Sequence, residues 1–371
     1  MEEKKNIIKD RLACIDVLRG FNMFFLVGAA EVIRRFIKGF NTEALEPLYR
    51  QLTHVEWQGF VAWDLIMPLF LFTSGLSMPF SFDKLYAKGF TKAQIYKKVF
   101  KRFFILFLLG WIVAGNLLDF NVANFRIYTN TLQSIAFGYL ITALIVLNIK
   151  NATAQLASGI SLVVIYWALM AFASVPGVGS GVYTVENNFA IYIDRIILGP
   201  LMSPKAQYSW VLSSLGFGAT VFSGYYAGLM LKEKIDAKKK LLRLLLAGVG
   251  LIVAGLLLSI HQPIIKKLWT SSMVLYSSGL SFLLLAISFW ITDMMKIDCW
   301  WTRGFRMFGL NAIAAYMIWQ IFQLKGLSEY WTHGLKQYTG AFYPCIVALC
   351  QFGITWFIIR HLYKHKIFIK V

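Results

Sequence analysis

Apolar segments of about twenty residues recur along this chain, and their length constrains its fold more than any other feature. An α-helix of that length is long enough to cross the hydrocarbon core of a bilayer. The apolar residues form continuous runs rather than alternating with polar ones, which favours membrane helices over the strands of a barrel. We therefore predict an all-α polytopic membrane protein.

The composition is typical of this class of protein. Of the 371 residues, 58% are hydrophobic and 15% are charged, whereas about 25% of the residues of a soluble globular protein are charged. Ten membrane spans are predicted. They cover residues 13–33, 60–81, 99–118, 131–148, 154–173, 208–231, 242–260, 271–293, 305–324 and 341–360.

The formal net charge of +19 raises the question of nucleic-acid binding, and the distribution of the charge answers it. With the N-terminus inside, the inner loops carry most of the lysines and arginines, above all at 84–102 and 232–243. This excess follows the positive-inside rule and predicts that both termini are cytoplasmic, with residues 1–12 as a tail. The basic residues then serve topology and contact with anionic lipid, so nucleic acid is not an expected partner.

A single transmembrane domain is predicted over residues 1–371. Residues 34–59 form a link on the outer side, and residues 174–207 form the largest outer loop. Proline and glycine predict an irregular course for that loop, as a small cap over a cavity or as a plain connector. The four cysteines lack metal-ligand spacing, so no metal is expected.

The first span contains Asp16 and Arg19, which is unusual because an ionised side chain in a bilayer costs roughly 2.5 kcal/mol or more. The two charges argue against the alternative of a cleaved signal peptide over residues 1–30. They are three residues apart and share one helix face. Two interpretations stay open: an ion pair that fixes helix packing, or an Arg19 that holds an anionic ligand near the cytoplasmic face.

His54 lies in the link between the first two spans, near the outer surface, and Trp57 follows it. Histidine is the side chain best suited to proton transfer near neutral pH. Asp64 lies about one turn inside the second span, four residues before Pro68. Asp64 could orient His54 as a carboxylate orients a catalytic imidazole, or it could cap the backbone that the proline interrupts.

Three further polar features are candidates for binding. Lys266, Lys267 and Trp269 lie in an outer turn, which is either a solvated turn with a tryptophan anchor or a grip on an acidic sugar or on the far end of a cofactor. Gln133 and Asn311 are amides within predicted spans, where such side chains join helices or line a site.

Several motifs in this chain resemble the heparan-α-glucosaminide N-acetyltransferase family and its bacterial relatives. They cover nearly the whole membrane domain in the family's order. The motifs are RLACIDVLRGFNMFFLV, HVEWQG, WDLIMPLFLFTSGLSMPFS, LQSIAFGY, QPIIKKLWTSSMVLYSSG and FRMFGLNAIAAY.

The resemblance implies an enzyme that takes acetyl from cytosolic acetyl-CoA and gives it to a glucosamine amine across the membrane. It implies a multi-pass protein of the bacterial cytoplasmic membrane and a homodimer. The family's active histidine falls on His54, and its assisting asparagine falls on Ala30. This chain departs from the family there, so the adjacent Glu31 could substitute, or the acceptor could differ.

The sequence features and the family resemblance together give the expected site residues, and each of them has one expected role. His54 and Asp64 are the expected catalytic pair. The residues expected to bind acetyl-CoA are Asp16, Arg19, Gln133 and Asn311. The residues expected to bind the acceptor are Glu31, Trp57, Lys266, Lys267 and Trp269.

The sequence leaves three alternatives open. His54 could act as a general base, or it could carry the acetyl group in a two-step reaction. The acceptor could be a hydroxyl of an envelope polysaccharide rather than an amine. The chain could also be a transporter or flippase, because buried charges and broken helices occur in that class as well.

Overall fold

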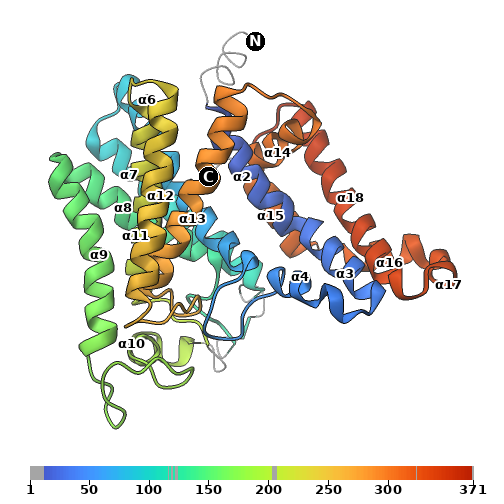
Figure 1. Cartoon of the computed structure of the whole chain (residues 1–371), viewed down its shortest axis with the longest axis horizontal. Coiled ribbons are helices and arrows are strands. Elements are labelled where there is room, and N and C mark those ends of the chain that lie inside the picture. Colours follow the sequence, from blue (N-terminus) through green and yellow to red (C-terminus); the bar gives the residue numbers. More distant parts are fainter. Residues whose placement is uncertain are drawn as a thin grey trace. The chain divides into compact units, whose positions relative to one another are not determined.

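The computed structural model describes residues 12–115, 117, 120–121, 124–202, 207–322 and 324–369, and it is helical throughout (Figure 1). The described residues form no strand, and their β-pairing is limited to two isolated bridges, Val175 with Gly179 and Tyr183 with Asn188. The predicted all-α class is therefore confirmed. The predicted tail lies outside the described residues, apart from Leu12.

Seven helical segments of the described part are long and apolar enough to cross a membrane. They are Ala13–Phe40, Ala62–Ala87, Thr131–Asn148, Ala152–Phe172, Ala237–Leu258, Ser271–Met294 and Lys325–Lys364. Helices α7 (Lys92–Ala114), α11 (Ser214–Lys232) and α15 (Ala312–Ile321) occupy the other predicted spans. The count of ten spans and the cytoplasmic position of the termini stay predictions.

The chain forms two compact units that alternate along the sequence. The first comprises the described residues up to His54, Val61–Ile66 and those from Leu284 onward, and the second comprises Val55–Phe60 and Met67–Leu283. We describe each unit by itself, and the single transmembrane domain stays a prediction.

In the first unit, helices α2 (Ala13–Phe24) and α14 (Trp300–Leu310) pack against each other at two glycines. A Cβ atom added to Gly20 would lie 1.6 Å from the carbonyl oxygen of Phe305. A Cβ atom added to Gly309 would lie 1.9 Å from the carbonyl oxygen of Asp16. The helix backbones therefore touch, which is the close packing that small residues permit between membrane helices.

We expect Gly20→Ala to lower stability by at least about 2 kcal/mol, because the methyl group would overlap backbone and force the helices apart. Gly250→Ala in α12 (Ala237–Leu258) is the matched control, since an added Cβ there meets nothing within 4 Å. The control should be neutral or stabilise by up to about 1 kcal/mol. Thermal unfolding in detergent, followed by tryptophan fluorescence, measures both variants. Equal unfolding temperatures would show that α2 and α14 do not touch at Gly20.

The first predicted span is not one straight helix. A π-helical turn, η1 (Phe25–Ala29), separates α2 from α3 (Ala30–Phe40), and Gly28 there has φ 146°. Only glycine adopts that conformation readily, and the position faces the side chain of Phe352 on α18 (Tyr343–Lys364). The break gives α3 a direction of its own, and α3 continues to Phe40 rather than ending at the predicted residue 33.

The N-terminus of α2 is capped from a distant part of the chain. The carboxylate of Asp293 accepts hydrogen bonds from the backbone amides of Ala13 (3.2 Å) and Cys14 (2.8 Å). A carboxylate at this end satisfies unpaired amides and complements the helix dipole. The hydroxyl of Ser288 donates to the Cys14 carbonyl oxygen (3.0 Å), so two residues hold this helix start.

The second unit is built on α11, which packs against α8 (Thr131–Asn148), α9 (Ala152–Phe172) and α12, while α7 packs on α8 (Figure 1). Glycines again allow close contact: an added Cβ would lie 1.8 Å from the Val221 carbonyl oxygen at Gly75, and 1.9 Å from that of Phe72 at Gly224. The remaining α-helices among the described residues are α4 (Glu46–Gln51), α5 (Ile66–Leu76), α6 (Met78–Ala87), α10 (Phe189–Leu198), α13 (Ser271–Phe289), α16 (Lys325–Thr332) and α17 (Lys336–Thr339).

The predicted irregular loop at 174–207 contains helix α10, which the sequence analysis did not predict. Asp194 on α10 is buried and accepts hydrogen bonds from the backbone amides of Trp210 (2.7 Å) and Val211 (3.0 Å). These two bonds favour the charged carboxylate, but desolvation outweighs them and raises the pKa of Asp194 to about 6.

This raised pKa predicts a pH-dependent stability. A carboxyl whose folded-state pKa lies above its unfolded value contributes stability fully below about pH 4 and loses that contribution as the pH rises through about 6. The unfolding temperature of the wild type minus that of Asp194→Asn should therefore decrease as the pH rises from 4 to 7. The shift of about two pKa units corresponds to on the order of 2–3 kcal/mol. A difference that stays constant across this range would contradict the prediction.

Candidate functional site

His54 and Asp64 form a hydrogen-bonded pair within the first unit. His54 follows α4, and Asp64 lies in the short helical turn η3 (Ala62–Leu65) that precedes α5. The Nδ1 atom of His54 lies 2.7 Å from Oδ1 of Asp64. The carboxylate is fully buried, whereas the imidazole side chain is 45% exposed. The buried acid thus holds a histidine that a reactant can approach.

The two carboxylate oxygens of Asp64 have different partners. One oxygen meets His54, and the other accepts a hydrogen bond from the backbone amide of Val61 (3.3 Å) at the start of η3. A carboxylate has enough lone pairs for both partners. The catalytic roles of His54 and Asp64 stay predictions.

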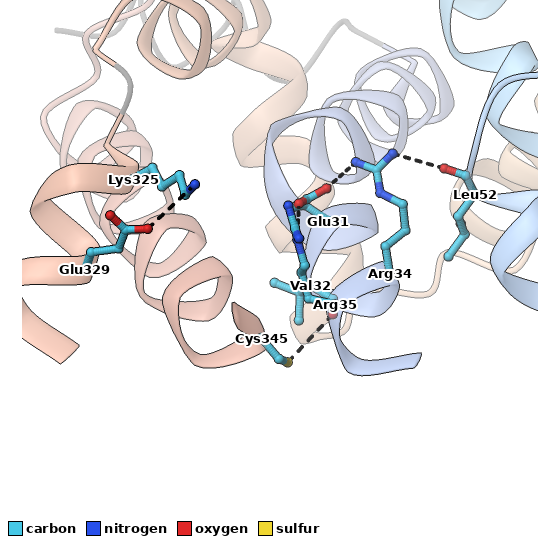
Figure 2. A network of polar contacts seen from close by, with 8 residues as sticks. All are labelled: Glu31, Val32, Arg34, Arg35, Leu52, Lys325, Glu329 and Cys345. Atoms are coloured by element: carbon cyan, nitrogen blue, oxygen red, sulfur yellow. Dashed lines mark hydrogen bonds and ion pairs between the residues drawn. The ribbon is translucent and has the colours of Figure 1, made fainter. Parts of the chain in front are cut away.

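Glu31 lies on the first turn of α3, next to the fully buried Ala30. Its carboxylate forms ion pairs with Arg34 and with Nε of Arg35 (2.6 Å), as Figure 2 shows. The methyl group of Ala30 offers no hydrogen bond at the position where the resemblance implies an assisting asparagine. Glu31 is therefore a charged partner of two arginines, and its predicted role toward the acceptor stays a prediction.

Asp16 and Arg19 lie one turn apart on α2. Asp16 is buried and Arg19 is partly exposed. Both predicted interpretations, an ion pair and an anion-binding arginine, stay open.

In the second unit, the segment around Trp57 is attached at two points. The indole Nε1 of Trp57 donates to the carbonyl oxygen of Tyr183 (2.7 Å), and the amide of Gly59 donates to that of Ile264 (2.9 Å). Trp57 is therefore tied to the 174–202 segment, and Gly59 is tied to the turn that carries the predicted acceptor-binding lysines.

The residues predicted from that turn have different surroundings. Lys266 is buried, while Lys267 is partly exposed, donates to Gln207 and lies 6.0 Å from the ring centre of Tyr208. Trp269 is a core side chain, since it is 2% exposed and its Nε1 donates to the Thr220 hydroxyl (3.1 Å). The structure thus places Trp269 inside the helix packing rather than at a membrane interface.

The two predicted amides are both buried, and they differ in how their polar atoms are used. Gln133 makes capping contacts at the start of α8: its oxygen accepts from the Thr129 amide (2.8 Å), and its nitrogen donates to the Ile127 carbonyl oxygen (3.0 Å). Asn311, between α14 and α15, accepts from the Ile369 amide (3.3 Å). Its Nδ2 has no hydrogen-bond partner among the described residues, which leaves a buried donor for a ligand.

The predicted site residues are divided between the units. The first unit holds Asp16, Arg19, Glu31, His54, Asp64 and Asn311, and the second holds Trp57, Gln133, Lys266, Lys267 and Trp269. Among the residues described, no three metal-ligating side chains gather.

Sequence reasoning did not single out Arg34, Asp194 or Asp293, although each makes a defined contact. The spacing of Glu31, Arg34 and Arg35 is a recognisable helical charge pattern, so Arg34 could have been noted. The backbone amides that Asp194 and Asp293 bind lie 16 to 280 residues away along the chain, and no local signal reveals them.

The comparisons with known proteins find similarity to members of the same family that the sequence motifs resemble. No protein-family model matches the chain. Heparan-alpha-glucosaminide N-acetyltransferase of mouse (Mus musculus) is 24% identical over 425 aligned positions, which cover 100% of this chain and 62% of the mouse protein. The human (Homo sapiens) protein of the same name is 23% identical, over 87% of this chain and 56% of its own length. The chain thus spans a little over half the length of these relatives. The chain is therefore similar to the mouse heparan-alpha-glucosaminide N-acetyltransferase along its whole length and to the human protein along most of it.

Proposed function

We propose that this chain is a transmembrane acetyltransferase that moves acetyl from cytosolic acetyl-CoA to an amino sugar on the other side of the membrane. The observation that carries the proposal is the His54–Asp64 pair, with a buried carboxylate 2.7 Å from a half-exposed imidazole. The proposal also assigns the chain to a bacterial cytoplasmic membrane, with both termini cytoplasmic, as a homodimer.

The chemistry assigned to the pair is general-base catalysis. An ionised Asp64 can only accept, so the neutral imidazole presents Nδ1–H to it and keeps Nε2 as the basic nitrogen. Nε2 removes a proton from the acceptor nitrogen, which attacks the thioester carbonyl carbon, and the carbon–sulfur bond breaks. The thiol of CoA leaves with a proton, and the acceptor becomes an amide.

Acetyl-CoA would supply the activated acetyl group. Two features of the first unit suit such a ligand. Arg19 is a partly exposed guanidinium, the group that best matches phosphate oxygens. The buried Nδ2 of Asn311 is a donor that a carbonyl of the cofactor could satisfy.

Free thiol release tests the proposal. Purified protein incubated with acetyl-CoA and glucosamine should release thiol faster than protein with acetyl-CoA alone. Mass spectrometry of the product distinguishes an amide from an ester, and therefore an amino sugar from a glycan hydroxyl. Absence of transfer to every amino sugar and glycan hydroxyl tested would contradict the enzyme function and favour a transporter.

A second measurement separates the two roles of His54. Protein incubated with radiolabelled acetyl-CoA and no acceptor should retain label after rapid quench if His54 carries the acetyl group. Unlabelled protein under the same conditions would support direct transfer with His54 as the base.

A further inference from the structure

Arg34 joins α3 to the chain segments on both sides of the His54–Asp64 pair. One terminal nitrogen of its guanidinium donates to the carbonyl oxygen of Leu52 (3.1 Å), two residues before His54. The guanidinium also lies over the ring of Trp63, 5.1 Å from its centre, one residue before Asp64. Figure 2 shows the side chain reaching from α3 to Leu52, with Glu31 beside it.

The contacts continue to the imidazole itself. The rings of Trp63 and His54 lie 6.2 Å apart, within the range of aromatic contact. The other terminal nitrogen of Arg34 is ion-paired with Glu31, which holds the guanidinium against its own helix. Arg34 is only 24% exposed, so these contacts are shielded from solvent more than those of a surface pair.

We propose that Arg34 is a positioning residue for the acetyl transfer: it fixes the backbone before His54 and the ring before Asp64, and so holds the pair in its productive geometry. This inference rests on the proposed function. Small displacements of catalytic groups are costly, because a shift of about 1 Å can lower a rate about 100-fold.

The contacts require arginine rather than any cation. A planar guanidinium can donate in two directions from its plane and present its face to an aromatic ring at the same time. A lysine ammonium on a flexible stem cannot keep the bond to Leu52, the pair with Glu31 and the stacking on Trp63 together. The site therefore depends on the planar arrangement of the guanidinium N–H groups more than on the positive charge.

Arg35 offers a matched control. It pairs with the same Glu31 from the same helix and carries the same charge, but it is 43% exposed. Arg34→Gln and Arg35→Gln each remove one positive charge and one partner of Glu31. Arg34→Gln alone removes the contacts to Leu52 and Trp63.

The test compares these variants in detergent by steady-state acetyl transfer. We expect Arg34→Gln to lower kcat at least 10-fold with the KM for acetyl-CoA unchanged within twofold, and Arg35→Gln to stay within twofold of the wild type. Arg34→Lys should not restore kcat, because it keeps the positive charge but loses the planar guanidinium with its several donors. If Arg34→Gln does not fold, Arg34→Lys carries the test, and full activity in it would overturn the inference.

A second readout needs neither acetyl-CoA nor an acceptor. Diethylpyrocarbonate modifies histidines, and mass spectrometry gives the rate at His54 relative to the exposed His333. We expect Arg34→Gln to speed modification of His54 at least threefold, and Arg35→Gln to leave it unchanged. If the wild type transfers acetyl and both variants match it in both readouts, the inference is wrong while the proposed function stands. If the wild type transfers no acetyl, the proposed function fails, and the modification rates still decide whether Arg34 positions His54.

Discussion

His54→Ala should lower acetyl transfer by on the order of 10²–10⁴-fold, because it removes the proposed acceptor for the proton of the attacking amine. The imidazole is half exposed and its partner carboxylate is buried, so the substitution removes reactivity without removing a core side chain. The protein should still bind CoA, since the candidate phosphate and amide contacts come from Arg19 and Asn311. We expect the dissociation constant for CoA to change less than threefold.

Thiol release and isothermal titration with CoA measure the two quantities in one preparation. His333→Ala is the control, because this histidine is also exposed and belongs to the same unit. It should transfer acetyl as the wild type does. Transfer by His54→Ala within threefold of the wild type would contradict a role of His54 as base or as carrier. Loss of both transfer and CoA binding would point to an unfolded variant, which the unfolding temperature reveals.

Asp64→Asn is the second substitution with a large expected effect. An asparagine has nearly the same shape, but it has one acceptor oxygen where the carboxylate uses two, toward His54 and toward the Val61 amide. Its NH₂ group must face one of these partners, so His54 loses its tautomer or η3 loses its cap. We expect kcat to fall by on the order of 10²–10⁴-fold, as when the acid of a catalytic triad becomes an amide.

The stability cost of Asp64→Asn should be smaller, about 1–3 kcal/mol for one buried hydrogen bond left unmade. Steady-state kinetics and thermal unfolding separate the two effects. Asp298→Asn is the control, because Asp298 is exposed and its ion pair is with Arg303 (3.0 Å). A normal kcat together with a lowered unfolding temperature would mean that Asp64 serves only as a backbone cap.

Several elements of the fold could be predicted from apolar runs alone. The prediction at 131–148 coincides with α8, and that at 271–293 differs by one residue from the helical segment Ser271–Met294. Long apolar runs are reliable because every backbone polar group in a bilayer must pair within its own helix. The breaks were missed, at Gly28 in the first span and at Asn311 in the ninth, where α14 ends and α15 begins. Glycine and asparagine are common at such positions, but neither residue by itself requires a break.

The candidate site was predictable only in part. His54 and Asp64 are ten residues apart with a proline nearby, and that spacing allowed both an acid–imidazole pair and a backbone cap. In the structure, one oxygen of Asp64 lies beside the imidazole of His54, and the other accepts a hydrogen bond from the Val61 amide. Trp269 was predictable as a tryptophan near a helix end, and nothing local distinguished an interface anchor from the buried ring that donates to Thr220.

The class of this protein follows from its amino-acid sequence alone, because the length and continuity of the apolar runs are local properties that decide whether a helix can cross a bilayer. The sequence also identifies the polar residues that are candidates for function, since a charge among apolar neighbours is costly in any fold. The partners of these polar residues depend on the three-dimensional packing: Asp293 on the amides of α2, Arg34 between Leu52 and Trp63, and Asp64 between His54 and Val61. Hydrogen bonds act over about 3 Å, and the residues that come this close are set by how helices break and pack rather than by their order in the chain.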